Sequence, residues 1–161
     1  MINVTHIQPH QIADAKYVIS AVAQRIFEPE ITPQEFSDIL EEEKELKDVD
    51  DYQRAYVENR GLFLVVMDEN KLVGTGAIKK YDEKIAELKR IWLLEEYHGQ
   101  KIGYQVVMRL LDFARANGYE KVWLQTSTKQ ERAIRFYTRF GFYKIPNYHE
   151  GMDDYSMEIK L

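Results

Sequence analysis

The chain has 161 residues, with 22 Lys+Arg against 27 Asp+Glu and a formal net charge of −5. This length fits one domain, expected over residues 1–161, and hides roughly 70% of the unfolded surface, enough for a core without crosslinks. The absence of cysteine excludes disulfides, iron–sulfur clusters and thiolate zinc sites. The acidic balance disfavours a nucleic-acid-binding protein. Since no apolar segment is long enough to span a membrane and residues 1–10 lack the pattern of a signal peptide, we expect a cytoplasmic protein.

The first third of the chain predicts one short strand followed by three helices. Thr32 is the expected cap of the second helix and Pro33 its first residue. That helix is expected to continue into the acidic run at residues 41–45 as a solvated face. Gly61 is the expected stop of the third helix. The predicted ranges are 2–7 for the strand and 10–27, 33–45 and 49–59 for the helices.

From residue 62 onward, short apolar runs bounded by turn residues favour strands. Three of them, at residues 62–67, 72–78 and 86–94, are joined by short turns and are expected to form an antiparallel meander. Two helices and three strands complete the chain, giving an α/β (α+β) fold with a mixed sheet. The predicted ranges are 101–116 and 130–140 for these helices and 122–125, 142–145 and 155–159 for the strands.

The stretch most informative about chemistry covers residues 87–104, which read ELKRIWLLEEYHGQKIGY. A strand runs into a turn with Gly99 and Gly103, and that turn opens a helix. The first backbone N–H groups of a helix lack intrahelical partners and carry partial positive charge, so this terminus suits a phosphate. Turn formation and packing alone also account for two glycines at a helix start. The stretch contains neither a Walker loop nor a dinucleotide-binding fingerprint.

This stretch resembles the phosphate-binding signature of the GNAT superfamily of acyl-CoA-dependent N-acetyltransferases. The family pattern is Gln or Arg, two residues, Gly, one residue, then Gly or Ala. Here Gly103 matches, His98 replaces the Gln or Arg, and Lys101 replaces the first Gly. The frequent neighbouring glycine is present as Gly99.

A second segment is similar to the family's N-x-x-A-x-x-x-Y segment, which is followed by Gly-Phe. It contains Ala133, Tyr137 and the pair at residues 141–142, whereas Gln130 stands where Asn is usual. The two segments together cover about residues 60–145. The resemblance implies a mixed, mostly antiparallel central sheet with helices on both faces.

The resemblance also implies acetyl-CoA as cosubstrate and assigns residues to it. In the family, the strand before the signature leaves backbone groups free for the pantetheine arm, which maps here to Ile91, Trp92 and Leu93. The amide of Leu93 would also hold the oxyanion. The remaining residues expected at the cofactor are His98, Gly99, Gln100, Lys101, Ile102, Gly103, Tyr104, Gln130 and Tyr137.

The resemblance implies two further catalytic side chains besides the Leu93 amide. Tyr137 is expected to protonate the departing thiolate, although an aromatic residue on a helix also serves plain packing. Glu87 lies sixteen positions before Gly103, as does the base glutamate of some family members. It is expected to take the amine proton directly or through water, the alternative being an exposed or ion-paired strand residue.

Further residues are candidates for the base and for the acceptor pocket. Some family members place a base glutamate at the end of the next strand, but this chain has Gln125 there, which takes up no proton. Tyr148 and His149 are further candidates for the base. Tyr143 and Tyr148 are candidates for lining the acceptor pocket. Because Pro9 separates His6 from His10, the two do not form a helical metal pair, and no metal is expected.

The expected reaction is direct attack by the primary amine of a small molecule on acetyl-CoA in a ternary complex. The acceptor is expected to enter near residues 27–34. Residues 145–148 resemble the closing hairpin of ribosomal-protein and protein N-terminal acetyltransferases, which leaves a peptide amino terminus as an alternative acceptor. The departures from the signature leave open a non-catalytic CoA-binding sensor. Family analogy also allows a homodimer.

Overall fold

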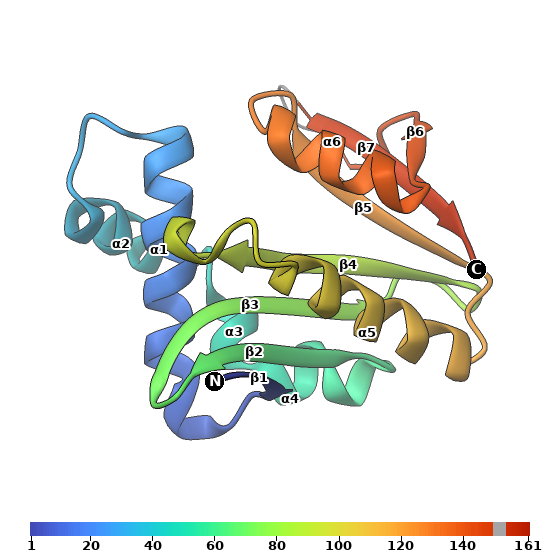
Figure 1. The fold of residues 1–161 in the computed structure, drawn as a ribbon, viewed down its shortest axis with the longest axis horizontal. Helices are drawn as coiled ribbons and strands as arrows, with labels where there is room; N and C mark the ends of the chain where they lie inside the picture. Colours follow the sequence, from blue (N-terminus) through green and yellow to red (C-terminus); the bar gives the residue numbers. More distant parts are fainter. Residues whose placement is uncertain (150–153) are drawn as a thin grey trace.

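The computed structural model, which describes residues 1–149 and 154–161, is built on one seven-stranded sheet (Figure 1). The strand order is β1-β2-β3-β4-β5-β7-β6. Neighbouring strands are antiparallel except β4 and β5, which are parallel. The strands are β1 Ile2–His6, β2 Leu62–Asp68, β3 Lys71–Lys80, β4 Ile85–Leu93, β5 Lys121–Ser127, β6 Tyr143–Ile145 and β7 Asp154–Lys160. The predicted antiparallel meander is therefore confirmed as β2, β3 and β4.

Helices cover both faces of the sheet, as expected. The helices α5 and α6 lie on the near face in Figure 1, and α1 to α4 belong to the core of the opposite face. None of the helices in the described parts of the chain is long and apolar enough to cross a membrane. The helices are α1 Ile12–Phe27, α2 Pro33–Glu42, α3 Lys47–Asp50, α4 Tyr52–Ala55, α5 Ile102–Ala116 and α6 Glu131–Phe140, with 3-10 turns η1 Pro9–Gln11, η2 Val57–Asn59 and η3 Glu95–Tyr97.

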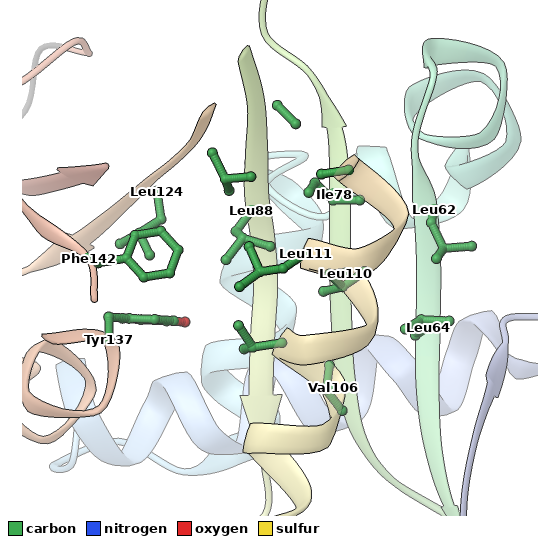
Figure 2. Packing of buried hydrophobic residues seen from close by; sticks show 14 of the residues in the cluster. Leu62, Leu64, Ile78, Leu88, Val106, Leu110, Leu111, Leu124, Tyr137 and Phe142 are labelled. Carbon is green, nitrogen blue, oxygen red and sulfur yellow. The ribbon is translucent and has the colours of Figure 1, made fainter. Parts of the chain in front are cut away.

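Two hydrophobic cores, one on each face, follow from the alternation of side chains along the strands. On the near face, Leu110 and Leu111 of α5 pack over Leu88 of β4, and Leu124 and Phe142 extend this core toward the second half of the sheet (Figure 2). Complete burial of a leucine side chain contributes about 1.5–3 kcal/mol. The core on the other face holds apolar residues of α1, α3, α4, β2 and β3. These two cores hold β2, β3 and β4 rigidly between the helices.

The sheet opens between β4 and β5. The two strands pair only over residues 85–87 and 121–123, and β4 then diverges from β5 (Figure 1). A bulge accompanies the divergence, because Ala77 of β3 pairs with Lys89 whereas Thr75 pairs with Trp92, which leaves one extra residue on β4. Arg90 lies in this bulge with a φ of 59°. The outer half of β4 therefore has a strand partner only in β3.

The prediction of one continuous helix over residues 49–59 is wrong. The chain forms three short pieces, α3, α4 and η2, with breaks at Asp51 (φ −100°, ψ 32°) and Tyr56 (φ −120°, ψ −61°). Val49, Tyr52 and Tyr56 are nevertheless all buried, at the spacing of one helical face. The apolar spacing therefore predicts the buried face of this segment but not its breaks.

Two boundaries near this segment also differ from expectation. The second helix ends at Glu42 instead of continuing to residue 45, because Lys44 adopts a φ of 58° and the turn buries Leu46. Gly61 does not end a helix by its own conformation, since the left-handed residue is Arg60 (φ 50°). Instead, Gly61 is needed for close packing, because a Cβ there would lie 2.1 Å from the carbonyl oxygen of Ile78.

Candidate functional site

A cavity of about 280 Å³ lies where β4 and β5 diverge. It is an opening in the sheet itself, and it therefore has backbone as well as side chains in its walls. Its closed end is the last residue pair shared by the two strands, Glu87 and Trp123. The cavity is lined by residues 87–92 of β4, residues 124–126 of β5, Gln130, Ala133 and Tyr137 at α6, and Glu45 before α3.

The bulge in β4 is held by hydrogen bonds from β3 and from the segment around α3. The Thr75 hydroxyl donates to the Arg90 carbonyl at 2.7 Å. The Arg90 guanidinium donates to both carboxylate oxygens of Asp48, at 3.0 Å and 2.7 Å, and to the Glu45 carbonyl at 2.7 Å. The Tyr56 hydroxyl also donates to Asp48, at 2.5 Å. This network ties the short helices to the strand that forms one wall of the cavity.

Asp48 is ionised within this network. Its partial burial opposes the charged form, but the hydrogen bonds and charge of Arg90 outweigh that effect and hold the pKa of Asp48 below its usual value. Burial, followed by the charge of Asp48, raises the pKa of the Tyr56 phenol. The phenol therefore remains protonated and serves as a donor. No sequence pattern predicts this network, because Arg90 lies 42 positions from Asp48 in the chain.

The outer end of β4 presents backbone groups toward the opening. Leu94 N–H donates to the Val73 carbonyl at 3.0 Å. Because bonding alternates along an antiparallel pair, the N–H and C=O of Leu93 point away from β3. Nε2 of His98 lies 2.9 Å from the Leu93 carbonyl oxygen, which agrees with a carbonyl that points away from β3. The N–H of Leu93 thus faces the side on which the sheet is open.

The helix α5 begins without a side-chain cap. The first bond of its ladder is donated by Gln105 N–H to the Lys101 carbonyl at 3.1 Å. The N–H groups of residues 102–104 therefore have no helical partners. Two left-handed residues shape the turn before them, Gly99 (φ 82°) and Lys101 (φ 63°). This terminus can accept an anion through backbone donors and the helix dipole.

Tyr137 of α6 lines the cavity and is 6% exposed. Figure 2 shows its phenol oxygen pointing from α6 toward β4. The ring packs edge-on against Phe136 and Phe142, with centroids at 5.2 Å and 5.6 Å. Burial raises the pKa of this phenol above its usual value. Tyr137 therefore stays neutral at ordinary pH and has a proton to donate.

Glu87 lies at the closed end of the cavity and is only 3% exposed. Its Oε2 accepts a hydrogen bond from the Tyr148 hydroxyl at 2.8 Å and lies 3.4 Å from Nε2 of His149. Burial, followed by the charge of Glu87, raises the pKa of Tyr148. Tyr148 and His149, the other two candidates for the base, thus both lie beside Glu87. Glu87 is therefore not the exposed strand residue of the alternative interpretation, and the bulge of β4 lies three positions further along, at Arg90.

Several residues proposed from sequence do not reach the cavity. Tyr143 is exposed and donates its hydroxyl to Glu158, and Tyr104 is half exposed and stacks on Phe140 with a centroid distance of 4.9 Å. The His98 ring is held within its own turn by the Leu93 carbonyl. Residues 27–34, the expected entry of the acceptor, do not line the cavity, whereas Glu45 does. The acceptor route therefore remains a prediction.

Within residues 1–149 and 154–161, no three His, Cys, Asp or Glu side chains cluster in a way that could hold a metal ion. The polar groups around the cavity include the neutral phenol of Tyr137 and the buried carboxyl group of Glu87. These two groups suit proton transfer.

The sequence of this chain is similar to those of known acetyltransferases. The acetyltransferase (GNAT) family model matches residues 27–142. An uncharacterized N-acetyltransferase of Mycobacterium bovis is 26% identical over 154 residues, which cover 89% of this chain and 96% of that protein. Human N-acetyltransferase 8 is 36% identical over 103 residues, or 60% of this chain and 45% of that protein. The chain thus corresponds to less than half of the human protein.

Solved structures share the whole architecture. An acetyltransferase from Streptococcus agalactiae superimposes with a TM-score of 0.85 at 22% identity, covering 99% of this chain and 98% of that one. The PaiA N-acetyltransferase from Thermoplasma acidophilum, solved in complex with coenzyme A, gives a TM-score of 0.82 at 20% identity, covering 100% and 99%. At such identities the likeness establishes the fold alone.

Proposed function

Because the chain belongs to the acetyltransferase (GNAT) family, we propose that it transfers the acetyl group of acetyl-CoA to the primary amine of a small molecule. One observation carries the proposal: the cavity between β4 and β5 has the neutral phenol of Tyr137 in one wall and the carboxylate of Glu87 at its closed end. The uncapped start of α5 follows the same β4 strand. The coenzyme A bound by the PaiA relative supports the choice of cosubstrate.

The proposed cofactor position follows from the unpaired backbone groups. The diphosphate would accept hydrogen bonds from the N–H groups of residues 102–104, within the turn formed by residues 98–101. The pantetheine arm would run along Ile91, Trp92 and Leu93, opposite Gln130 on the other wall. A glycine is not essential at Lys101, since the donors belong to the main chain.

The proposed reaction forms a C–N bond and breaks the C–S bond of the thioester. Glu87, or a water molecule that it orders, takes the proton that the attacking amine must lose. The N–H of Leu93 stabilises the oxyanion of the tetrahedral intermediate. Tyr137 donates its proton to the departing thiolate, which leaves as free coenzyme A. Much of the rate enhancement would come from holding the two substrates together.

The experiment measures free thiol while the protein is incubated with acetyl-CoA and three acceptor sets: free amino acids, alkyl diamines, and a short peptide with a free amino terminus. We expect thiol release with at least one small amine. Tyr137→Phe should lower kcat by about 100-fold, because a positioned general acid contributes at least that factor. The dissociation constant for coenzyme A, measured by calorimetry, should change less than about twofold, since the phenol acts only on the leaving group.

Other outcomes assign the protein differently. Release of thiol with the peptide alone would make the acceptor a peptide terminus. Tight coenzyme A binding without thiol release in any set would indicate a sensor. Unchanged turnover in Tyr137→Phe would remove this residue from the mechanism.

A further inference from the structure

Tyr148 and His149, which follow β6 in the chain, lie beside the buried carboxyl group of Glu87 at the closed end of the cavity. Tyr148 donates its hydroxyl to Oε2 of Glu87 although the two residues are 61 positions apart. We propose that Tyr148 is a positioning residue, which holds Oε2 of Glu87 by a hydrogen bond and leaves its second carboxylate oxygen for the acceptor amine. The inference rests on the proposed function, in which Glu87 receives the amine proton.

The backbone that carries Tyr148 is anchored to β7. Asn147 donates its side-chain amide to the Asp154 carbonyl at 3.2 Å. The side-chain oxygen of Asn147 accepts a hydrogen bond from the Ser156 hydroxyl at 3.1 Å, and Ser156 is fully buried. One amide thus ties this segment to two residues of the strand. The position of Tyr148 is therefore set by the sheet.

Aromatic packing fixes the direction of the Tyr148 ring. The ring lies against Trp123 with centroids 4.7 Å apart, and against Tyr81, from the turn after β3, at 5.3 Å. Trp123 is itself held by a hydrogen bond from Nε1 to Glu158 at 2.7 Å. Tyr81 also contacts Trp123 at 4.7 Å. Packed rings with anchored neighbours leave the phenol little freedom, so its hydroxyl stays directed at Glu87.

The two oxygens of Glu87 have different surroundings. Oε2 has Tyr148 at 2.8 Å and His149 at 3.4 Å, whereas Oε1 makes no hydrogen bond with any residue in the described parts of the chain. Charged residues on the same face of the sheet include Lys79, the register partner of Glu87 on β3, Lys89 on β4, and Glu158 on β7, which pairs with Trp123. Since the residue lines the cavity, Oε1 is the oxygen available to a ligand there.

Burial makes this arrangement necessary. A carboxylate that is 3% exposed has lost most of its hydration, and it stays charged only if donors replace the lost water. The Tyr148 hydroxyl supplies such a donor to Oε2 and leaves the other oxygen as a proton acceptor. A carboxylate that became neutral at working pH could not accept the amine proton.

The test follows the carboxyl resonance of Glu87 by carbon-13 NMR of the full chain as pH is varied. Comparison with Glu87→Gln assigns the resonance. Tyr148→Phe keeps the ring but removes the donor, so the titration midpoint should rise by about one pH unit, as expected for a lost hydrogen bond to a charged group. The matched control is Tyr143→Phe, which removes the phenol bonded to Glu158 and should leave the Glu87 midpoint unchanged.

Activity supplies the second readout. The acidic limb of the pH dependence of kcat/KM should move upward in Tyr148→Phe by the same amount as the NMR midpoint, with little change in kcat on the alkaline side. A second variant, His149→Gln, should move both in the same direction by a smaller amount, because His149 lies farther from Oε2.

The failures of the two proposals are distinguishable. An unmoved NMR midpoint in Tyr148→Phe, in a protein that melts like wild type, would overturn the role of Tyr148 whether or not transfer is observed. A raised midpoint without acetyl transfer would sustain the contact with Glu87 and overturn the proposed function. A raised midpoint with an unmoved acidic limb would show that Glu87 is not the base and would overturn the inference.

Discussion

At the residue scale, Lys101 replaces a glycine of the family signature in a conformation that favours glycine. Its φ of 63° is left-handed, and the Cβ of a non-glycine residue crowds the backbone there at a cost of about 1 kcal/mol. Gly99, two positions earlier, has a φ of 82° and carries no such cost. The turn thus has a left-handed conformation at two positions, only one of which is glycine.

Lys101→Gly should accordingly raise the free energy of unfolding by up to about 0.5 kcal/mol, since relief of about 1 kcal/mol of left-handed strain is partly offset by the extra freedom of glycine in the unfolded chain. Urea denaturation at pH 7 measures the change. Gln100→Gly is the matched control, because residue 100 does not have a positive φ and should only lose stability. Equal losses in both variants would contradict strain at Lys101.

At the element scale, the short helices α3 and α4 hold β4 in its bulged shape. Arg90 extends from the bulge to Asp48 on α3, with a bidentate contact of 3.0 Å and 2.7 Å. Both side chains are about one-fifth exposed, so this ion pair is less screened by water than surface pairs are. Asp48 of α3 thus anchors the bulge of β4 through Arg90.

Asp48→Asn should lower the free energy of unfolding by about 2 kcal/mol at pH 7, since it leaves the Arg90 charge without its partner. The folded pKa of Asp48 is lowered, so its contribution is complete above the usual aspartate value and disappears as pH falls through the lowered one. The difference between wild type and variant in urea denaturation should therefore shrink below a pH of about 4.

The control for this prediction is Asp50→Asn on the same helix. Asp50 pairs with Lys16 at 3.0 Å but is 47% exposed, so the change should cost less than about 1 kcal/mol. A loss for Asp48→Asn no greater than that of Asp50→Asn, or one that persists unchanged at low pH, would refute the proposed role of the ion pair.

At the scale of the whole molecule, two parts of the sheet meet over three residue pairs. The strands β1 to β4 form one part and β5 to β7 the other, and β4 and β5 pair only at residues 85–87 and 121–123. Beyond them, α6 and η3 are connected by the exposed ion pair of Arg132 with Glu95 at 2.9 Å. A ligand that fills the opening should therefore stabilise the molecule by contacting both parts.

Coenzyme A at 100 times its dissociation constant should stabilise the fold by about 2.7 kcal/mol and raise Tm by roughly 5–10 °C for a chain of this size. Pantetheine at the same concentration lacks the diphosphate and should raise Tm much less, because it leaves the N–H groups at the start of α5 unused. Thermal melts with each ligand measure the difference. Equal shifts would argue against diphosphate binding at α5.

Local patterns determined most of the elements and the family. The apolar stripe of α5, the strands of the meander and the turn at residues 98–103 depend on neighbours in the chain, so they could be predicted from it. Tyr137 and Glu87 could be named through the resemblance, and both line the cavity. The sequence by itself thus determined the fold class, the family and the principal candidates for the site.

Tertiary structure alone decided which distant groups meet. The breaks at Asp51 and Tyr56, the bond between Arg90 and Asp48 and that between Tyr148 and Glu87 each depend on packing between segments far apart in the chain. Periodicity describes which face of an element is apolar, but it carries no record of which polar side chain comes to lie opposite another. Burial makes these contacts necessary, because a charge removed from water must find its partner within the fold.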